Sequence, residues 1–437
     1  MEKTRRRVYD FLSKEGLYHG DISIDATCKA FLKEMGRGLA GLRSSLAMLP
    51  TYLDIERKIP TNKPVIVMDA GGTNFRVATV VFGPDGVPAV GDFRVYSMPG
   101  IRKEVGKEEF FATMAGYVEN VLDTSRNIGF CFSYPIEMFP SRDGRALYFS
   151  KEIKAEEAAG QMIGQSLNVA IRQMGRSGKK HVVLLNDTVA TLLAGRASAV
   201  GCYYDSYIGF ILGTGTNTCY VEQNSEIIKA SDLDLGKSQI VNIESGGFDK
   251  APRGPTDEEL DASSMSPGVN VFEKMISGAY LGLLCLKTVH LAARKGLFSR
   301  ATAKRVKAAH QATTKDVSDF LTLAERGDNP LAKALAGQRQ EDVMAVYCLM
   351  DAIVERAAKL TAINLSSAAI KCGKGRNPCR PVCIVAEGTT FYHLRSLKHK
   401  VECYLTQYLT NEKDIYYDIV NVDNATLIGA AIAGLTN

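Results

Sequence analysis

The spacing of apolar residues changes along the chain, and this spacing distinguishes expected helices from expected strands. Between Phe31 and Leu42 the apolar side chains recur at helical spacing, so residues 1–60 are expected to be helical as far as a break at Pro50. From about residue 63 the period becomes two, which is typical of strands. The strands expected in this part cover 65–69, 75–82, 93–98 and 129–135.

The middle of the chain repeats its own beginning. The layout of 65–82, an apolar strand, a glycine-threonine loop and an alternating strand, recurs at 207–222. Between the copies, 159–175 is an amphipathic helix and 181–195 is a strand followed by a helix. The copies start about 140 residues apart, so we expect a duplicated architecture with two related lobes facing one cleft.

The last third is mostly helical by pattern. Residues 251–268 are rich in Pro, Asp and Ser and are expected to form a surface loop. Long apolar faces predict helices over 271–296 and 341–370, and 382–388 is one more strand ending in glycine. Small residues fill the expected C-terminal helix at 420–434.

Composition excludes several classes of protein. The chain has 437 residues, 46% of them hydrophobic, which is enough for a large core and most simply two domains. Lys and Arg number 53 against 48 acids, a formal balance of +5 that gives no reason to expect a nucleic-acid partner. No apolar run reaches the roughly 18 residues that a membrane span needs, and the basic N-terminus has no apolar targeting segment.

The ten cysteines are scattered along the chain. Even the nearest group, Cys372, Cys379 and Cys383, lacks the two-residue spacing of zinc or redox motifs. We therefore expect reduced thiols and a cytoplasmic protein.

The loop inside MDAGGTNFRV (68–77) is the first candidate for chemistry. A glycine loop between strands exposes backbone N–H groups that can bind phosphate oxygens. It lacks the Lys-Ser/Thr of a P-loop and precedes a strand, so an ordinary turn is an alternative reading. The second copy, Gly213 to Thr216, favours a polyphosphate held from two sides. Asp69, at the end of its strand, is placed to bind Mg²⁺ directly or through water.

Asp187 stands where a strand passes into a helix. One interpretation is a helix cap without catalysis. The other is a carboxylate that accepts the proton of a substrate hydroxyl during phosphoryl transfer.

These residues resemble the eukaryotic-type hexokinase family along nearly the whole chain. The matching motifs occur in the family's order: MLPTY (48–52), DAGGTNFRV (69–77), GFCFSYP (129–135), LNDTVATL (185–192), GTGTN-CY (213–220) and FEKMISGAYLG (272–282). The resemblance implies an α/β protein with the actin-like ATPase, ribonuclease H-like fold, whose two lobes close over sugar and ATP. It implies a small lobe of 61–189 plus 424–437 and a large lobe of 1–60 plus 190–423.

The resemblance also implies roles for individual residues. Asp187 would be the general base, and Lys151 would neutralise charge on the moving phosphoryl group. The residues implied to line the sugar pocket are Ser133, Ser150, Lys151, Asn186, Asp187, Asn217, Glu244, Asn270 and Glu273. Those implied to bind the nucleotide are Asp69, Gly71, Gly72, Thr73, Asn74, Arg76, Gly213, Thr214, Gly215, Gly388 and Thr389, with Asp69 on Mg²⁺.

The chain departs from the family at several positions. The family's Glu-Trp-Gly-Ala-Phe reads Glu244 to Phe248 with Ser245 in place of Trp, and the chain contains no Trp. Ser150 replaces Thr, Asn270 replaces Gln, and Ile136-Glu137 follows the Ser-Tyr-Pro turn. These changes predict an altered volume around the sugar. The family's C-terminal glycine-rich turn reads Asn424 to Gly429, which changes how the adenine end would be held.

The expected function is therefore phosphorylation of the 6-hydroxyl of a hexose, glucose first, by ATP and Mg²⁺, for entry into glycolysis. The enzyme would act as a monomer or homodimer. A catalytically weak sugar sensor acting through protein partners is the main alternative. An actin-like ATPase that polymerises is a third reading, but it leaves Asn186, Asn217, Glu244 and Glu273 unexplained as a polyol-binding set.

Overall fold

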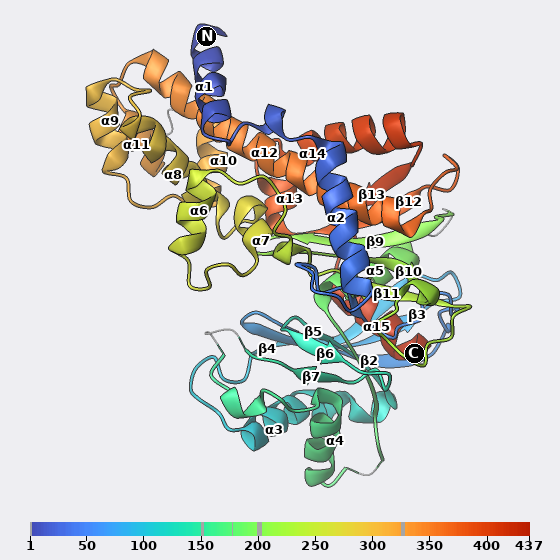
Figure 1. Cartoon of the computed structure of the whole chain (residues 1–437). Helices are drawn as coiled ribbons and strands as arrows, with labels where there is room; N and C mark the ends of the chain where they lie inside the picture. Colours follow the sequence, from blue (N-terminus) through green and yellow to red (C-terminus); the bar gives the residue numbers. More distant parts are fainter. Residues whose placement is uncertain (1, 150–152, 177, 199–202, 325–327) are drawn as a thin grey trace.

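Two mixed β-sheets, each covered by helices, form the two lobes of the protein (Figure 1). The computed structural model describes residues 2–149, 153–176, 178–198, 203–324 and 328–437.

The five-stranded sheet of the small lobe has the order β4-β3-β2-β5-β8. Its strands are β2 (Pro64–Gly71), β3 (Asn74–Phe82), β4 (Pro88–Ser97), β5 (Asn127–Phe132) and β8 (His181–Leu185). β2 and β3 form an antiparallel hairpin, whereas β5 and β8 run parallel to β2. Helices α3 (Lys107–Val118) and α4 (Ile163–Gln173) cover one face, where Ile66, Met68 and Phe130 join their core. A separate hairpin, β6 (Ile136–Met138) and β7 (Gly144–Ala146), leads back towards α4.

The six-stranded sheet of the large lobe repeats this layout, with the order β1-β11-β10-β9-β12-β13. Its strands are β1 (Leu49–Pro50), β9 (Ser206–Leu212), β10 (Thr216–Gln223), β11 (Ser238–Asn242), β12 (Val382–Glu387) and β13 (Tyr417–Val420). Again a hairpin, β9 and β10, is followed in space by parallel strands β12 and β13. The duplication predicted from the two glycine loops is confirmed.

Two helices made mostly of small and aliphatic residues lie between the sheets. They are α5 (Asp187–Ser198) and α15 (Ala425–Thr436). α5 packs on β9 and β12 of the large lobe, α15 packs on β2 and β5 of the small lobe, and the two helices pack on each other. The predicted division of the chain into 61–189 plus 424–437 and 1–60 plus 190–423 stays a prediction, and its boundary at 189/190 would fall inside α5.

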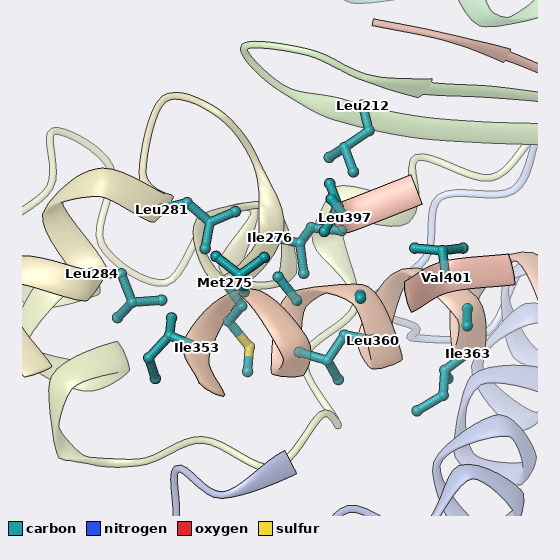
Figure 2. Close-up of a cluster of buried hydrophobic side chains, with 14 of the residues drawn as sticks. Leu212, Met275, Ile276, Leu281, Leu284, Ile353, Leu360, Ile363, Leu397 and Val401 are labelled. Carbon is teal, nitrogen blue, oxygen red and sulfur yellow. The ribbon is translucent and has the colours of Figure 1, made fainter. Parts of the chain in front are cut away.

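The remaining helices build the large lobe. They are α1 (Glu2–Lys14), α2 (Ile24–Leu39), α6 (Pro255–Ala262), α7 (Val271–Ile276), α8 (Leu281–Arg294), α9 (Arg300–Lys307), α10 (Thr314–Thr322), α11 (Pro330–Leu335), α12 (Gln340–Cys372), α13 (Thr389–His393) and α14 (Leu397–Leu405). The 33-residue α12 is the centre of this lobe and is buried along most of its length. Figure 2 shows Ile353, Leu360 and Ile363 of α12 among the apolar side chains of α7, α8 and α14.

Three sequence predictions are wrong in detail. The expected loop 251–268 contains α6, because Pro255 starts a helix well and the Asp257 carboxylate accepts the Gly254 N–H. The single helix expected over 271–296 is interrupted between α7 and α8, where Gly278 and Ala279 donate to the carbonyls of the second glycine loop. The first long helical pattern ends at Leu39, and Leu42 is 59% exposed.

Crossing a membrane requires a helix that is both long and apolar. Within the described parts of the chain, no helix meets both conditions.

Candidate active site

The first glycine loop is the tight turn of the β2–β3 hairpin. Gly71 pairs with Asn74, so Gly72 and Thr73 form a two-residue turn, and Gly72 has φ +58°. Gly72, Thr73, Asn74 and Arg76 are exposed, so this turn is open to a ligand. The turn and the phosphate interpretations are therefore compatible, since the same geometry presents backbone N–H groups at an exposed tip.

Asp69 lies just before this turn and is only 3% exposed. Its Oδ2 accepts hydrogen bonds from Arg76 Nη1 at 3.1 Å and from Thr426 Oγ1 at 3.0 Å. Burial raises the pKa of Asp69, and Arg76 opposes this shift. Thr426 belongs to the N-terminal turn of α15, so the departure from the family's glycine-rich turn places a hydroxyl group on this carboxylate.

The second glycine loop is held by two other segments, the link between α7 and α8 and the first turn of α13, which follows β12. Gly213 O accepts hydrogen bonds from Gly278 N at 2.9 Å and Thr390 Oγ1 at 2.8 Å, while Thr214 O accepts one from Ala279 N at 3.0 Å. Gly388 has φ +114° and leaves no room for a Cβ, which would lie 2.3 Å from Leu212 O. The predicted nucleotide residues Gly213, Thr214, Gly388 and Thr389 are therefore brought together.

A cavity of about 500 Å³ opens beside this loop. Its lining includes Thr214, Gly278, Thr314, Lys315, Thr389 and His393. A space of this size, lined by hydroxyl groups, one lysine and loop backbone, can hold a nucleoside next to a phosphate-binding loop. Thr214, Gly278 and Thr389 lie in segments that the sequence had marked, whereas Thr314, Lys315 and His393 carried no sequence signal, because they come from helices whose contact with the loop is set by tertiary packing.

Asp187 is the first residue of α5, directly after β8. Thr188 donates to Asp187 Oδ1 twice, from its N–H at 2.7 Å and from its Oγ1 at 3.2 Å. Burial raises the pKa of Asp187, the Thr188 hydrogen bonds oppose this, and the negative charge of Asp69 raises it further. A carboxylate whose pKa is raised is a better proton acceptor, as a general base requires.

Ser133 completes the group at the carboxyl ends of β2 and β5. A Cβ built on Gly71 would lie 3.5 Å from Ser133 Oγ and 3.6 Å from Asp69 Oδ1. A Ser133 hydrogen bond also lowers the pKa of Asp187. The first glycine loop, Ser133 and the two aspartates therefore share one region.

The predicted sugar residues of the large lobe form a second, connected group. Asn217 Nδ2 donates to Glu244 Oε1 at 3.3 Å, and Glu273 Oε2 accepts the Thr216 N–H at 2.9 Å. Burial raises the pKa of Glu244 and that of Glu273. The negative charges of Asp187 and Glu273 also raise the pKa of Glu244, so these three carboxylates lie close enough to repel one another.

The other predicted sugar residues are placed as follows. Asn270 is exposed at the start of α7, with φ +50°, and Asn186 Oδ1 accepts the Thr188 N–H at 2.9 Å. Ser150 and Lys151 lie outside the described residues.

Three supporting contacts escaped the sequence analysis. Asn242 bridges Asn217 and Glu244, with Asn217 Nδ2 to Asn242 Oδ1 at 2.8 Å and Asn242 Nδ2 to Glu244 Oε1 at 2.7 Å. Lys274, next to Glu273, donates to Asp261 Oδ1 at 2.5 Å and to Ser266 O at 2.7 Å. The third contact is that of Thr426 with Asp69. Nothing local reveals these contacts, even where the residue lies in a quoted motif, since each partner belongs to another part of the chain.

Ser245, which stands where the family has Trp, is fully buried. Its Oγ donates to Thr218 Oγ1 at 3.2 Å, and Asn364 of α12 donates to the same Thr218 oxygen at 2.7 Å. The side chain therefore lies in the interior of the large lobe, and the altered volume around the sugar that the sequence predicts stays a prediction.

Mg²⁺ prefers oxygen ligands and is usually held by one or two carboxylates together with substrate phosphates. Among the residues that the structure describes, no group of three His, Cys, Asp or Glu side chains could hold a metal ion by itself. Asp69, a single carboxylate beside an exposed glycine loop, fits the shared type of site.

Profiles of the hexokinase family match residues 16–197 and 207–436, and the second match alone covers more than half of the chain. The chain belongs to the hexokinase family. Rice (Oryza sativa subsp. japonica) hexokinase-7 is 27% identical over 436 residues, covering 94% of this chain and 92% of that protein. Arabidopsis thaliana hexokinase-1 is 29% identical over 437 residues, with coverages of 92% and 86%.

The fold agrees with this membership. A hexokinase from Schistosoma mansoni, solved in complex with glucose, superposes with a TM-score of 0.76 at 21% identity and covers 98% of this chain and 99% of that one. The predicted actin-like ATPase fold, with two lobes, is confirmed, as is the resemblance to the hexokinase family. Membership of the hexokinase family makes the protein a sugar kinase, a transferase of phosphoryl groups.

Proposed function

We propose that the protein transfers the γ-phosphoryl group of ATP to the 6-hydroxyl of a hexose, with glucose as the first sugar to test. One observation carries this proposal: the second glycine loop is joined to the carboxylates of Glu273 and Glu244, through the Thr216 N–H and the Asn217 amide, and the charge of Asp187 acts on Glu244. The glucose bound to the Schistosoma mansoni relative supports the choice of sugar.

The sugar would be held by carboxylates and amides. Each hydroxyl of a hexose is both a donor and an acceptor, so Glu244 and Glu273 would accept hydrogen bonds while Asn217 and Asn270 could do either. Such a site rejects analogues that leave its polar groups unpaired. Ser150 and Lys151 belong to this proposal through the family motif alone.

Asp187 would take the proton of the 6-hydroxyl at its carboxylate as the phosphoryl group arrives. The two hydrogen bonds from Thr188 to Oδ1 fix the carboxylate, so it need not reorient during the reaction. Closure of the lobes over the sugar would exclude water, which would otherwise compete with the hydroxyl for the phosphoryl group.

ATP would lie between the glycine loops, with its nucleoside in the cavity of about 500 Å³. The backbone N–H groups of 71–74 and 213–215 would face the phosphates. Mg²⁺, held by Asp69 together with the phosphates, would neutralise their charge, and Lys151 would add a positive charge as the phosphoryl group moves.

A cytoplasmic location belongs to the same proposal. The nine cysteines within the described residues are all free thiols, which supports it.

A coupled assay of ADP release across glucose, fructose, mannose and galactose, with and without Mg²⁺, tests the proposal. We expect Mg²⁺-dependent and sugar-dependent release with at least one hexose. Asp187→Ala should keep glucose binding in calorimetry and lose turnover by about 10²–10⁴-fold. Asp123→Ala, at an acid whose side chain is 86% exposed, is the control and should be fully active.

Two results would contradict the proposal. Glucose binding without ADP release from any hexose would favour a sugar sensor that acts through protein partners. Near-normal turnover of Asp187→Ala would remove Asp187 from its role as the base.

A further inference from the structure

Asn242, the last residue of β11, lies between two residues assigned to the sugar and is 5% exposed. Its role follows from the hydrogen bonds of its neighbour Asn217. The oxygen of the Asn217 amide accepts two backbone N–H groups, Thr218 N at 2.7 Å and Ser245 N at 3.4 Å. Backbone donors cannot be acceptors, so the orientation of this amide is fixed with its nitrogen away from them.

The orientation of the Asn217 amide determines the orientation of the Asn242 amide. Asn217 Nδ2 donates to Asn242 Oδ1 at 2.8 Å, so the Asn242 nitrogen must point the other way, and it donates to Glu244 Oε1 at 2.7 Å. Asn217 Nδ2 also reaches Glu244 Oε1, at 3.3 Å. One oxygen of Glu244 thus receives two N–H donors from a chain that begins at the backbone, and the other oxygen is left to face a ligand.

The charges near Glu244 make this arrangement necessary. Burial, Asp187 and Glu273 all raise the pKa of Glu244, whereas the hydrogen bonds of Asn242 and Asn217 lower it. On the neighbouring α7, Lys274 is turned to Asp261 and is bound there. The hydrogen bonds of the two amides therefore favour the ionised form of Glu244.

We propose that Asn242 is a positioning residue for sugar binding: it fixes the orientation of the Glu244 carboxylate without contacting the sugar itself. This inference rests on the proposed function. The amide at position 242 suits this role, because it can accept from Asn217 and donate to Glu244 at the same time.

Asn242→Asp gives the sharpest test, since it keeps the size and the acceptor but replaces the donor with a second carboxylate. At pH 8 the two carboxylates would repel each other, and the Kd of glucose should rise at least tenfold, with kcat at saturating glucose within threefold of wild type. At pH 6 a proton shared between the two acids would replace the lost N–H bond. The Kd of the variant should then fall as the pH is lowered, whereas that of the wild-type protein should stay constant or rise. Calorimetry measures the Kd of glucose for the variant and for the wild-type protein at each pH.

Two further variants separate positioning from folding. Gln239→Glu is the matched control: Gln239 is a buried amide of the same strand, and it donates to Asn224 Oδ1 at 2.9 Å, away from the sugar residues. It should lower the melting temperature but leave the Kd of glucose and its pH dependence unchanged. Asn242→Ala removes both hydrogen bonds without adding charge, so its Kd should rise at least tenfold at both pH values.

The outcomes are distinguishable. Wild-type protein that neither binds nor phosphorylates a hexose would overturn the proposed function. Wild-type protein that does so, together with folded Asn242→Asp or Asn242→Ala whose Kd stays within threefold at both pH values, would overturn the role of Asn242. If Asn242→Asp does not fold, Asn242→Ala decides. A reversed pH dependence in Gln239→Glu as well would show that the effect is not specific to position 242.

Discussion

Gly429 of α15 and Ala190 of α5 are in direct backbone contact: a Cβ built on Gly429 would lie 1.8 Å from the carbonyl oxygen of Ala190. These helices lie between the two sheets, α5 against the large lobe and α15 against the small lobe. The absence of a side chain at 429 therefore allows the close approach of α15 and α5, which lie between the two lobes (Figure 1).

Gly429→Ala should destabilise the protein, although Ala is the better helix former by about 1 kcal/mol. The new methyl group can be accommodated only if α5 and α15 move apart, which opens the packing between the sheets. We expect a lower midpoint in urea denaturation and a higher Kd of glucose. Gly36→Ala in α2, where an added Cβ meets nothing within 4 Å, is the control and should stabilise the fold by about 0.5–1 kcal/mol. If the Gly429→Ala protein were as stable as the Gly36→Ala protein, this would contradict the close contact between Gly429 and Ala190.

The sequence predicted the repeated hairpins well, because each is a local pattern of alternating residues around a glycine turn. It also predicted a small-residue helix at the C-terminus, but not that Gly429 in particular must be glycine, since that depends on a partner more than 200 residues away. The sequence did not predict the interruption between α7 and α8 at Ser277–Tyr280, for the same reason. Its cause is the hydrogen bonding of Gly278 and Ala279 to Gly213 and Thr214.

The residues of the candidate site likewise fall into two groups, those with a local sequence signal and those without one. Residues at strand ends or in glycine loops, such as Asp69 and Asp187, carry a local signal, and the family motifs add to it. Asn242 and Thr426 hold other side chains in place, and their importance appears only when distant elements are brought together.

Thr426→Val should weaken the binding of ATP with Mg²⁺. The hydroxyl donates to Asp69 Oδ2 at 3.0 Å, and a hydrogen bond to a charged group contributes about 1.5–3 kcal/mol. We expect the KM of ATP to rise about tenfold or more, with Thr426→Ser close to wild type. Thr436→Val, in the same helix, removes a hydroxyl that donates to Ile432 O, and it should leave this KM unchanged. Equal KM values for the valine and serine variants at position 426 would argue against the contact.

Arg356→Met should be strongly destabilising. Arg356 of α12 forms a bidentate pair with Asp257 of α6, with N–O distances of 2.8 and 2.6 Å, and both side chains are nearly inaccessible. Removal of one partner leaves a buried charge unpaired, which costs about 3–5 kcal/mol in guanidinium denaturation. Arg356→Met combined with Asp257→Leu should recover part of this loss. Arg176→Met, at an exposed pair with Asp123, should change stability by less than about 1 kcal/mol. A similarly small loss of stability in Arg356→Met would mean that water reaches the Arg356–Asp257 pair.

Asp187→Asn should lose activity but gain stability, and the gain in stability should depend on pH. Burial raises the pKa of Asp187 in the folded protein, so the folded state binds the proton more tightly than the unfolded chain does. The ionised carboxylate therefore destabilises the fold as the pH rises above the range in which an unfolded Asp titrates. Asn keeps an oxygen for Thr188 and carries no charge, so the variant should be more stable than wild type at pH 8. The difference should shrink as the pH falls towards 4, because the wild-type carboxyl group becomes neutral. Urea denaturation at pH 8 and pH 4 measures this, with Asp123→Asn as the exposed control. A difference that is equal at both pH values, or a less stable variant at pH 8, would show that Asp187 does not carry a buried charge in the folded protein.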